Sequence, residues 1–172
     1  NSEIYFGSDN GRVWCYQKEN GQFQLQNLPA SSRIVSINSV EGNELIFTTA
    51  KDGFFSYQPK TKAIEHFPAS RFPNASIHSV YVDKASEVWF EQHIPGTVVH
   101  FNPRTRILKQ EKVPVEPTST DRSRPAFHIH EDINGVLWVH PYGGGFSYFD
   151  RKSNSLHPFY NSLSGSDWRF SN

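Results

Sequence analysis

The sequence predicts an all-β protein, a partial β-propeller of about three and a half to four four-stranded antiparallel blades. A phrase that begins with an aromatic residue recurs four times at offsets of 41, 44 and 48 residues. Its copies start at Tyr16, Tyr57, Phe101 and Phe149, and an apolar residue follows each start by seven positions, at Phe23, Ile64, Leu108 and Leu156. A second phrase runs ahead of the first with offsets of 41, 43 and 49 residues, as Ile4–Phe6, Leu45–Phe47, Val88–Phe90 and Leu137–Val139. Repeats of about 40–50 residues with strand composition are typical of propeller blades.

Composition agrees with strands and excludes some classes of partner. Aromatic residues make up 15% of the 172 residues, which favours strands over helices. The 17 basic and 17 acidic side chains cancel, so there is no overall field to attract nucleic acid or an anionic membrane. We therefore expect no nucleic-acid partner and no direct membrane contact. The only cysteine, Cys15, excludes an intrachain disulfide, and its strand pattern predicts a small buried residue.

Each complete copy contains four strands in a fixed order. A leading strand is followed by the strand of the second phrase, an aromatic strand and a last strand. The leading strands are expected at Ile34–Asn38, Ile77–Tyr81 and Phe127–His130, whereas the first copy starts at Glu3 without one. The blades are expected at about 1–26, 27–69, 70–112 and 113–162, with 163–172 as the start of a further blade. The chain is thus interpreted as an internal piece of a longer protein.

Turn signals separate these strands. Polar segments of hairpin length, 59–62, 103–106 and 151–154, join the last two strands of the copies. Asp83–Ser86 and Asp132–Gly135 are turns before the second-phrase strand. The segment 109–125 contains three prolines and is predicted to be an insertion between blades, because proline cannot lie in a central strand.

The fourth copy carries the most specific pattern. It reads Glu131-Asp132, a turn, Gly135-Val136-Leu137-Trp138-Val139, a glycine-rich turn and Phe149-Asp150. This resembles the two-component regulator propeller repeat, across the whole chain but most closely at 126–165. Other copies depart from the pattern, since Ile46 stands at the tryptophan position and Ser86 at the glycine position.

The resemblance implies an extracytoplasmic function. Proteins with this repeat form periplasmic sensor domains of hybrid two-component histidine kinases, and many detect polysaccharide breakdown products. It therefore implies a periplasmic fragment that binds an oligosaccharide and signals through a change in how two sensor chains associate. The kinase itself lies outside these residues.

Several residues suggest chemistry, but the repeat explains most of them. His128 and His130 share one strand face and could begin a metal site, yet they replace ordinary polar residues of the preceding copies, so we expect no metal. Trp89 and Trp138, with Trp14, could stack on sugars, but recurrence favours packing between blades. Recurrent aspartates before turns favour turn stabilisation over acid–base chemistry. No catalytic residue and no cofactor are expected, and the fragment is not expected to be an enzyme.

Residues that depart from the repeat are better ligand candidates. They lie in two equivalent loops and in the insertion: His93, His140, Tyr142, Arg122 and Arg124. An aromatic ring, imidazoles and guanidinium groups suit a sugar or an anion. Two alternatives stay open, a propeller glycosidase or lyase fragment and a non-catalytic protein–protein interaction propeller. We also expect a homo-oligomer, formed through the open blade edges.

Overall fold

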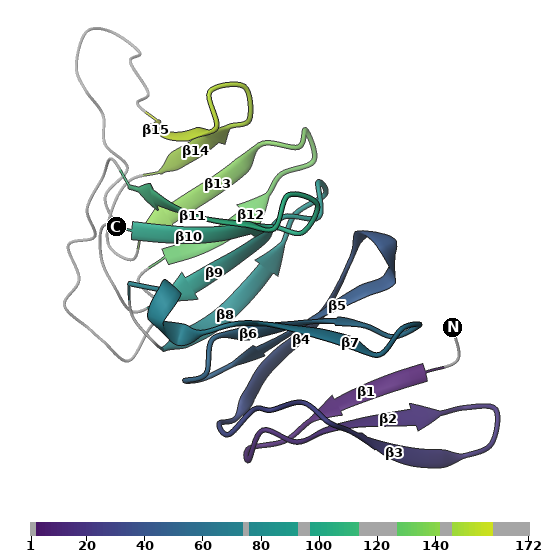
Figure 1. Ribbon diagram of the computed structural model, residues 1–172. Coiled ribbons are helices and arrows are strands. Elements are labelled where there is room, and N and C mark those ends of the chain that lie inside the picture. The colour runs from purple at the N-terminus through teal and green to yellow at the C-terminus, as the bar shows by residue number, and fades with distance from the viewer. Residues whose placement is uncertain (1–2, 74–75, 93–96, 114–126, 142–145, 160–172) are drawn as a thin grey trace, which may run out of the picture. The chain divides into compact units, whose positions relative to one another are not determined.

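The computed structural model describes residues 3–73, 76–92, 97–113, 127–141 and 146–159. Strands and two short 3₁₀ helices make up the regular structure of these ranges (Figure 1). The strands are β1 (Glu3–Gly7), β2 (Val13–Gln17), β3 (Gln22–Gln26), β4 (Ile34–Val40), β5 (Glu44–Thr49), β6 (Phe54–Gln58), β7 (Ala63–Phe67), β8 (Ile77–Val82), β9 (Val88–Gln92), β10 (Thr97–Asn102), β11 (Ile107–Lys112), β12 (Phe127–Glu131), β13 (Leu137–Pro141), β14 (Ser147–Asp150) and β15 (Ser155–Pro158). The 3₁₀ helices are η1 (Glu41–Asn43) and η2 (Ala69–Arg71). Within these ranges, no helix is long and apolar enough to cross a membrane.

The strands form four antiparallel sheets in which sequence neighbours are also spatial neighbours. The first sheet has three strands, β1-β2-β3, and the others have four each, β4–β7, β8–β11 and β12–β15. This confirms the all-β propeller-type fold, including the missing leading strand of the first copy. The sheets occupy 3–26, 34–67, 77–112 and 127–158, inside the four expected blade ranges. The expected further blade at 163–172 lies outside the described residues.

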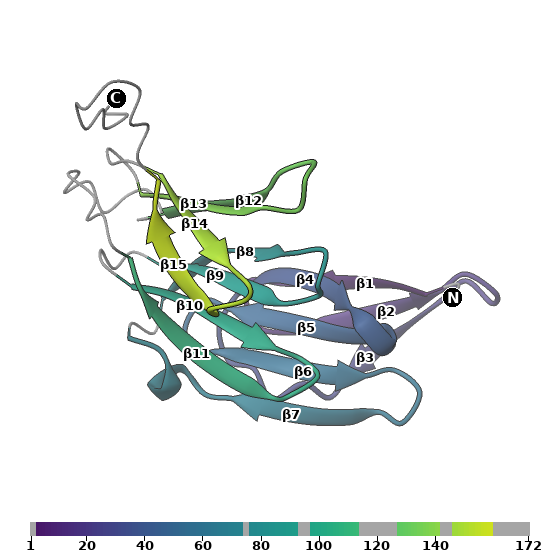
Figure 2. The same cartoon turned by 90° about the horizontal axis from the view of Figure 1, so that it is seen from above.

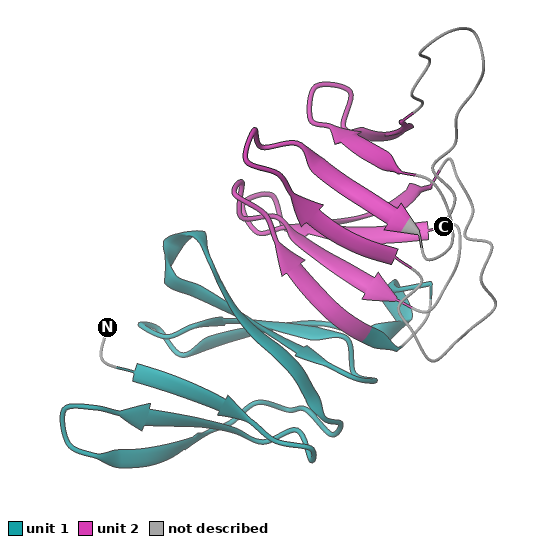
Figure 3. Ribbon diagram, turned by 180° about the vertical axis from the view of Figure 1, so that it is seen from behind, with its two compact units in different colours: residues 1–77 teal, residues 78–172 magenta. Residues whose placement is uncertain are grey.

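The chain divides into two compact units, 1–77 and 78–172, coloured separately in Figure 3. Each unit contains two sheets packed face to face, and the boundary falls at the first residue of β8. The core of the first unit joins the first two sheets through Val13, Phe47, Phe55 and Tyr57, with Tyr5 and Ile34 packed against them. Alternating side chains of each strand supply this core, as the pleat requires.

The second unit has its own apolar core between the sheets β8–β11 and β12–β15 (Figures 1 and 2). It contains Trp89, Val98 and Val113 from the first of these sheets and its following residue, and Phe127, Ile129, Leu137, Val139, Phe149 and Leu156 from the second. The two phrases found in the sequence therefore mark the strands that pack sheet against sheet.

The hairpin turns repeat the same backbone geometry in all four sheets. The residue five positions after each phrase start has a positive φ: Gly21 at 70°, Lys62 at 60°, Arg106 at 60° and Asn154 at 51°. Only the first copy uses glycine, the residue for which a positive φ carries no steric cost. The expected insertion is shorter than predicted at its start, because residues 109–112 belong to β11. β11 ends at Lys112, one residue before the last described residue of this segment, Val113.

Candidate functional site

Of the five sequence-selected ligand residues, one lies among the described residues. His140 belongs to β13, so the prediction that it sits in a turn is wrong; the extended strand continues to Pro141. Its imidazole stacks on the ring of Phe146 with centroids 4.5 Å apart. His93, Arg122, Arg124 and Tyr142 all lie outside the described residues.

The strands that lead to these candidates end together. β9 and β11 run in the same direction because each is antiparallel to β10. In Figures 1 and 3, β9, β11 and β13 all end at one end of the second unit. The last described residues before the candidate segments, Gln92, Val113 and Pro141, are therefore at that same end.

The histidines of β12 and β13 lie on one face of the last sheet. His128 and His130 are exposed, whereas Phe127 and Ile129, which alternate with them along β12, are buried. His128 is the cross-strand neighbour of His140. No group of three or more metal-binding side chains occurs in the part of the chain that the structure describes.

The recurrent aspartates stabilise turns and also hold the tryptophans. Asp83 Oδ1 accepts the Glu87 N–H at 2.9 Å, and its Oδ2 accepts the Trp89 indole N–H at 2.9 Å. Asp132 repeats this arrangement, since its Oδ2 accepts the Trp138 indole N–H at 3.0 Å. The Trp138 indole and the Val136 amide hold the pKa of Asp132 below its ordinary value. The turn function was predicted from sequence, whereas the aspartate–tryptophan bond was not.

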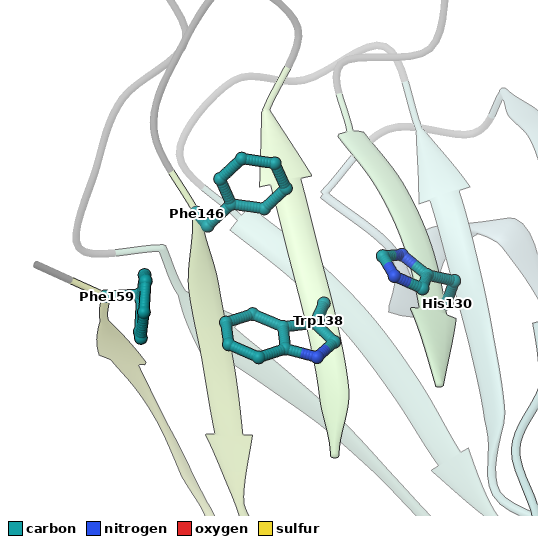
Figure 4. Close-up of a pocket in the computed structure, with 4 residues that line it drawn as sticks. All are labelled: His130, Trp138, Phe146 and Phe159. Carbon is teal, nitrogen blue, oxygen red and sulfur yellow. The ribbon is translucent and has the colours of Figure 1, made fainter. Parts of the chain in front are cut away.

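A hollow of about 240 Å³ lies on the outward face of the last sheet (Figure 4). It is lined by His130, Trp138, Phe146 and Phe159. Figure 4 shows the Trp138 indole between the other three side chains, with the Phe159 ring nearly perpendicular to it at 5.2 Å. In composition it could hold an apolar or sugar ligand. Its place in the repeat indicates another role, since the equivalent Trp89 is fully buried under the following sheet.

A second hollow, of about 200 Å³, lies in the first unit. Amide side chains, one phenol and one ammonium group line it, from Gln24, Gln26, Asn27, Tyr57 and Lys62, together with Leu25 and Ile64. The Tyr57 hydroxyl donates to Gln26 Oε1 at 2.8 Å. Amides and hydroxyls suit a ligand rich in hydroxyl groups. The spacing of the repeat gave no signal for this hollow.

A buried cluster of ionisable side chains lies in the second unit, where its two sheets meet. His100 is stacked on Trp89 with ring centroids 4.3 Å apart, and its ring nitrogens lie 3.4 Å from Glu87 and 3.4 Å from Glu111. The imidazole of His100, followed by the amide of Asn102, which donates at 2.9 Å, holds the pKa of Glu87 below its ordinary value. Sequence reasoning missed this cluster, although His100 departs from the repeat and that criterion could have found it.

The same interface contains an ion pair between the sheets. Arg151 Nη2 lies 3.0 Å from Asp83 Oδ2 and 3.7 Å from Glu131 Oε1. The backbone N–H of Ile129 also donates to the buried Glu91 at 3.0 Å. The carboxylates of Asp83 and Glu91 thus each bond to a group of the neighbouring sheet, an arrangement that joins blades.

Comparison with known proteins supports the fold. The sequence matches no protein-family model and no curated protein. The structure is similar to the extracellular domain of B. thetaiotaomicron BT4673, assigned to a one-component system, with a TM-score of 0.60, 20% identity, and coverage of 98% of this chain and 22% of that chain. It is also similar to the extracellular domain of the B. thetaiotaomicron protein BT3049, assigned to a hybrid two-component system, with a TM-score of 0.63, 15% identity, and coverage of 95% and 23%.

An enzyme is also among the similar structures. Virginiamycin B lyase from Staphylococcus aureus aligns with a TM-score of 0.58 and 15% identity over 95% of this chain and 56% of that chain. The chain spans only part of its neighbours' length: 22% of the BT4673 domain and 23% of the BT3049 domain. At these identities the likeness shows a common fold, and the fold alone does not decide between binding and catalysis.

Proposed function

We propose that this chain is a ligand-binding part of an extracytoplasmic sensor domain of a two-component signalling protein, located in the periplasm, with an oligosaccharide as its ligand. One observation carries the proposal: the fold is similar to extracellular domains of signalling proteins over 98% and 95% of the chain. The repeat seen in the sequence points the same way, because its fourth copy resembles a repeat of such sensors.

The proposed ligand site is at the end of the second unit where β9, β11 and β13 end (Figure 1). Along the sequence, His93, Arg122, Arg124 and Tyr142 belong to the segments that follow these strands, and His140 is the next-to-last residue of β13. Aromatic and cationic side chains at one end of a propeller suit a sugar that carries hydroxyl or carboxylate groups. Binding drives signalling only if the ligand has different affinities for the two arrangements of the sensor.

The described carboxylates support a binding function over a reaction. Asp83, Glu87 and Glu91 each bond to neighbouring backbone or side-chain groups that fix the sheets. A glycosidase needs two carboxylates that face one substrate bond. The likeness to virginiamycin B lyase favours a second candidate, a lyase fragment, and the same samples test it.

Isothermal titration calorimetry with a neutral xylo-oligosaccharide and an oligogalacturonide tests the proposal. We expect binding that His140→Ala and Arg124→Ala each weaken by at least about tenfold. His66→Ala is the matched control, because His66 lies in β7 of the first unit. If Gln26→Ala abolishes binding and His140→Ala does not, the ligand site is the hollow of the first unit and the proposed site is wrong.

Absence of binding to both probes, together with turnover of virginiamycin B, would replace the sensor proposal with the lyase. Absence of both binding and turnover would contradict the ligand class.

A further inference from the structure

The hollow of the first unit lies between the last strands of its two sheets. One wall is β3 with the following Asn27, and the other is the hairpin of β6 and β7, which contains Tyr57, Lys62 and Ile64. The leading strand that the first copy lacks would pair with β1, at the opposite edge of the first sheet from β3. The hollow is therefore independent of that missing strand.

Two glutamines of β3 lie on the face of the first sheet that is turned toward the second sheet. Gln26 is the cross-strand neighbour of Val13, a buried residue of the core that joins the two sheets. Gln24 is the cross-strand neighbour of Cys15, which is also buried. Because successive side chains point to opposite faces of a sheet, a sheet packed on the other face would leave both glutamines in place.

A fixed polar contact forms part of the lining. The buried Tyr57 donates its hydroxyl to Gln26 Oε1 at 2.8 Å, and Gln26 Nε2 donates to the backbone carbonyl of Gln24 at 3.2 Å. The Lys62 nitrogen lies 5.9 Å from the centroid of the Tyr57 ring. The Tyr57 side chain holds the pKa of Lys62 above its ordinary value, so Lys62 is an ammonium ion at neutral pH.

The remaining polar groups of the hollow are available to a ligand. Gln24 and Asn27 are exposed, and no described residue is hydrogen-bonded to either side-chain amide. Each carboxamide can donate and accept, which suits hydroxyl groups. None of the seven described residues that line the hollow is acidic, whereas Lys62 carries a positive charge. The lining therefore favours a ligand with both hydroxyl groups and a negative charge.

The equivalent place in the second unit is bridged by a side chain. In the repeat, Lys109 of β11 occupies the place of Gln24, and Asn154 of the last hairpin occupies the place of Lys62. Lys109 Nζ donates to the backbone carbonyl of Asn154 at 2.6 Å and also pairs with Glu111. In the first unit the cation is on the opposite wall, and about 200 Å³ stays open. The hollow is thus a property of these residues rather than of every blade interface.

We propose that this hollow is a second ligand site, separate from the site proposed in the second unit, and that it binds one sugar acid, a small molecule with a carboxylate and several hydroxyl groups. The carboxylate pairs with the Lys62 ammonium, and the hydroxyl groups bind the amides of Gln24 and Asn27. The Tyr57–Gln26 bond fixes part of the lining before the ligand arrives, which lowers the cost of ordering it. The volume is below the roughly 300–1,000 Å³ of clefts that hold drug-sized ligands, so it suits a single sugar ring.

Proton–nitrogen correlation spectra test the site, with sodium D-galacturonate as the probe and D-galactose as its uncharged match. We expect galacturonate to shift the side-chain amide signals of Gln24 and Asn27 in a saturable manner, and galactose to bind more weakly. Lys62→Met should weaken galacturonate binding by at least about tenfold, because it removes a charge-assisted hydrogen bond. Lys60→Met is the matched control, since Lys60 is exposed in the same hairpin and does not line the hollow.

Two further variants test the comparison between the units. Gln24→Lys/Lys62→Asn places the residues of the second unit in the first, so a lysine should cross the hollow and galacturonate binding should be lost. Gln24→Ala keeps the hollow open and should weaken binding by about fivefold through the loss of one hydrogen bond. His140→Ala should leave galacturonate binding unchanged, because His140 belongs to the other unit.

Three results would overturn the proposal. The first is the absence of shifts at Gln24 and Asn27, and the second is equal affinity for galacturonate and galactose, which would show that Lys62 binds no carboxylate. The third is an equal loss of binding in Lys60→Met and Lys62→Met, which indicates general attraction between charges. Shifts confined to the second unit and abolished by His140→Ala would also overturn it, and they would support the sensor site alone. The two proposed sites can therefore fail separately.

Discussion

Trp89 and Trp138 occupy the same place in two neighbouring sheets, yet their surroundings differ. Each indole N–H is bonded to the aspartate six positions earlier, at 2.9 Å and 3.0 Å. Trp89 is fully buried, stacked on His100 and in contact with Phe149 of the next sheet. Trp138 is half-buried beside an open hollow. The position in the repeat determines the local aspartate–tryptophan bond. Contact with a neighbouring sheet determines how far the tryptophan is buried, and therefore how much it contributes to the stability of the fold.

The residues that surround the two tryptophans also differ in polarity. Around Trp89 three residues depart from the repeat: His100, Glu87 and Arg151. They form contacts within and between the two sheets of the second unit. Around Trp138 the equivalent of His100 is Tyr148, and that of Glu87 is the uncharged Val136. Departures from the repeat can therefore mark an interface between blades as well as a ligand site.

The largest expected effect comes from truncating the two tryptophans. Trp89→Ala should lower the free energy of unfolding by about 3–5 kcal/mol, because it leaves a cavity between two sheets. Trp138→Ala should cost about 1–2 kcal/mol, because this side chain is only half-buried and already lines the hollow. Urea unfolding followed by circular dichroism measures both. Equal losses would show that the two environments do not differ as described.

Substitution of the two equivalent aspartates, Asp83 and Asp132, tests the same comparison. Asp83→Asn should lower the free energy of unfolding by about 2 kcal/mol, because the buried carboxylate accepts from Trp89 and also pairs with Arg151 of the next sheet. Asp132→Asn should have a smaller effect, since its bonds are within one turn and its strand. The double variant Asp83→Asn/Arg151→Gln separates the ion pair: if Arg151 contributes, the two losses are not additive.

Acid should weaken the interface around Trp89 through Glu87. Its pKa in the folded protein is below the ordinary value, so the carboxylate stabilises the fold above about pH 4.3, and this contribution is lost as pH falls through the folded pKa. Glu87→Gln should cost about 1 kcal/mol near pH 7 and progressively less in acid. Val136→Ala, at the equivalent place, is the control. A Glu87→Gln deficit that persists unchanged in acid would exclude the ionised Glu87 carboxylate as its cause.

Glycine at the positive-φ position of the hairpin turns should stabilise the fold in both sheets of the second unit, with the smallest effects of the series. Arg106→Gly should raise the free energy of unfolding by about 0.5–1 kcal/mol, because its φ of 60° strains a residue with a Cβ. Asn154→Gly should raise the free energy of unfolding by roughly a few tenths of 1 kcal/mol, since asparagine tolerates this conformation. Thermal unfolding measures both. A larger gain at Asn154 would contradict a geometry common to every sheet.

The repeat predicted the sheets well because strand pleating and hairpin turns are local. The phrases that start at Tyr16, Tyr57, Phe101 and Phe149 locate one strand in each of the four sheets. The same reasoning placed His140 in a turn, whereas β13 extends through it, because strand ends depend on cross-strand partners such as His128. The contacts of His100 and Arg151 could not be predicted, since they depend on how one sheet packs on the next. Packing of Trp89 was predicted correctly, but recurrence alone could not show that Trp138 and Trp14 would be left partly exposed.

The most direct test of the central claim is the rate at which the indole N–H groups exchange with solvent, followed by nuclear magnetic resonance. The chain has four tryptophans, which single Trp→Phe variants assign. Because Trp89 is fully buried between two sheets and Trp138 is half-buried beside a hollow, we expect the Trp89 signal to exchange much more slowly than the Trp138 signal. Equal exchange rates of the two signals would contradict the account.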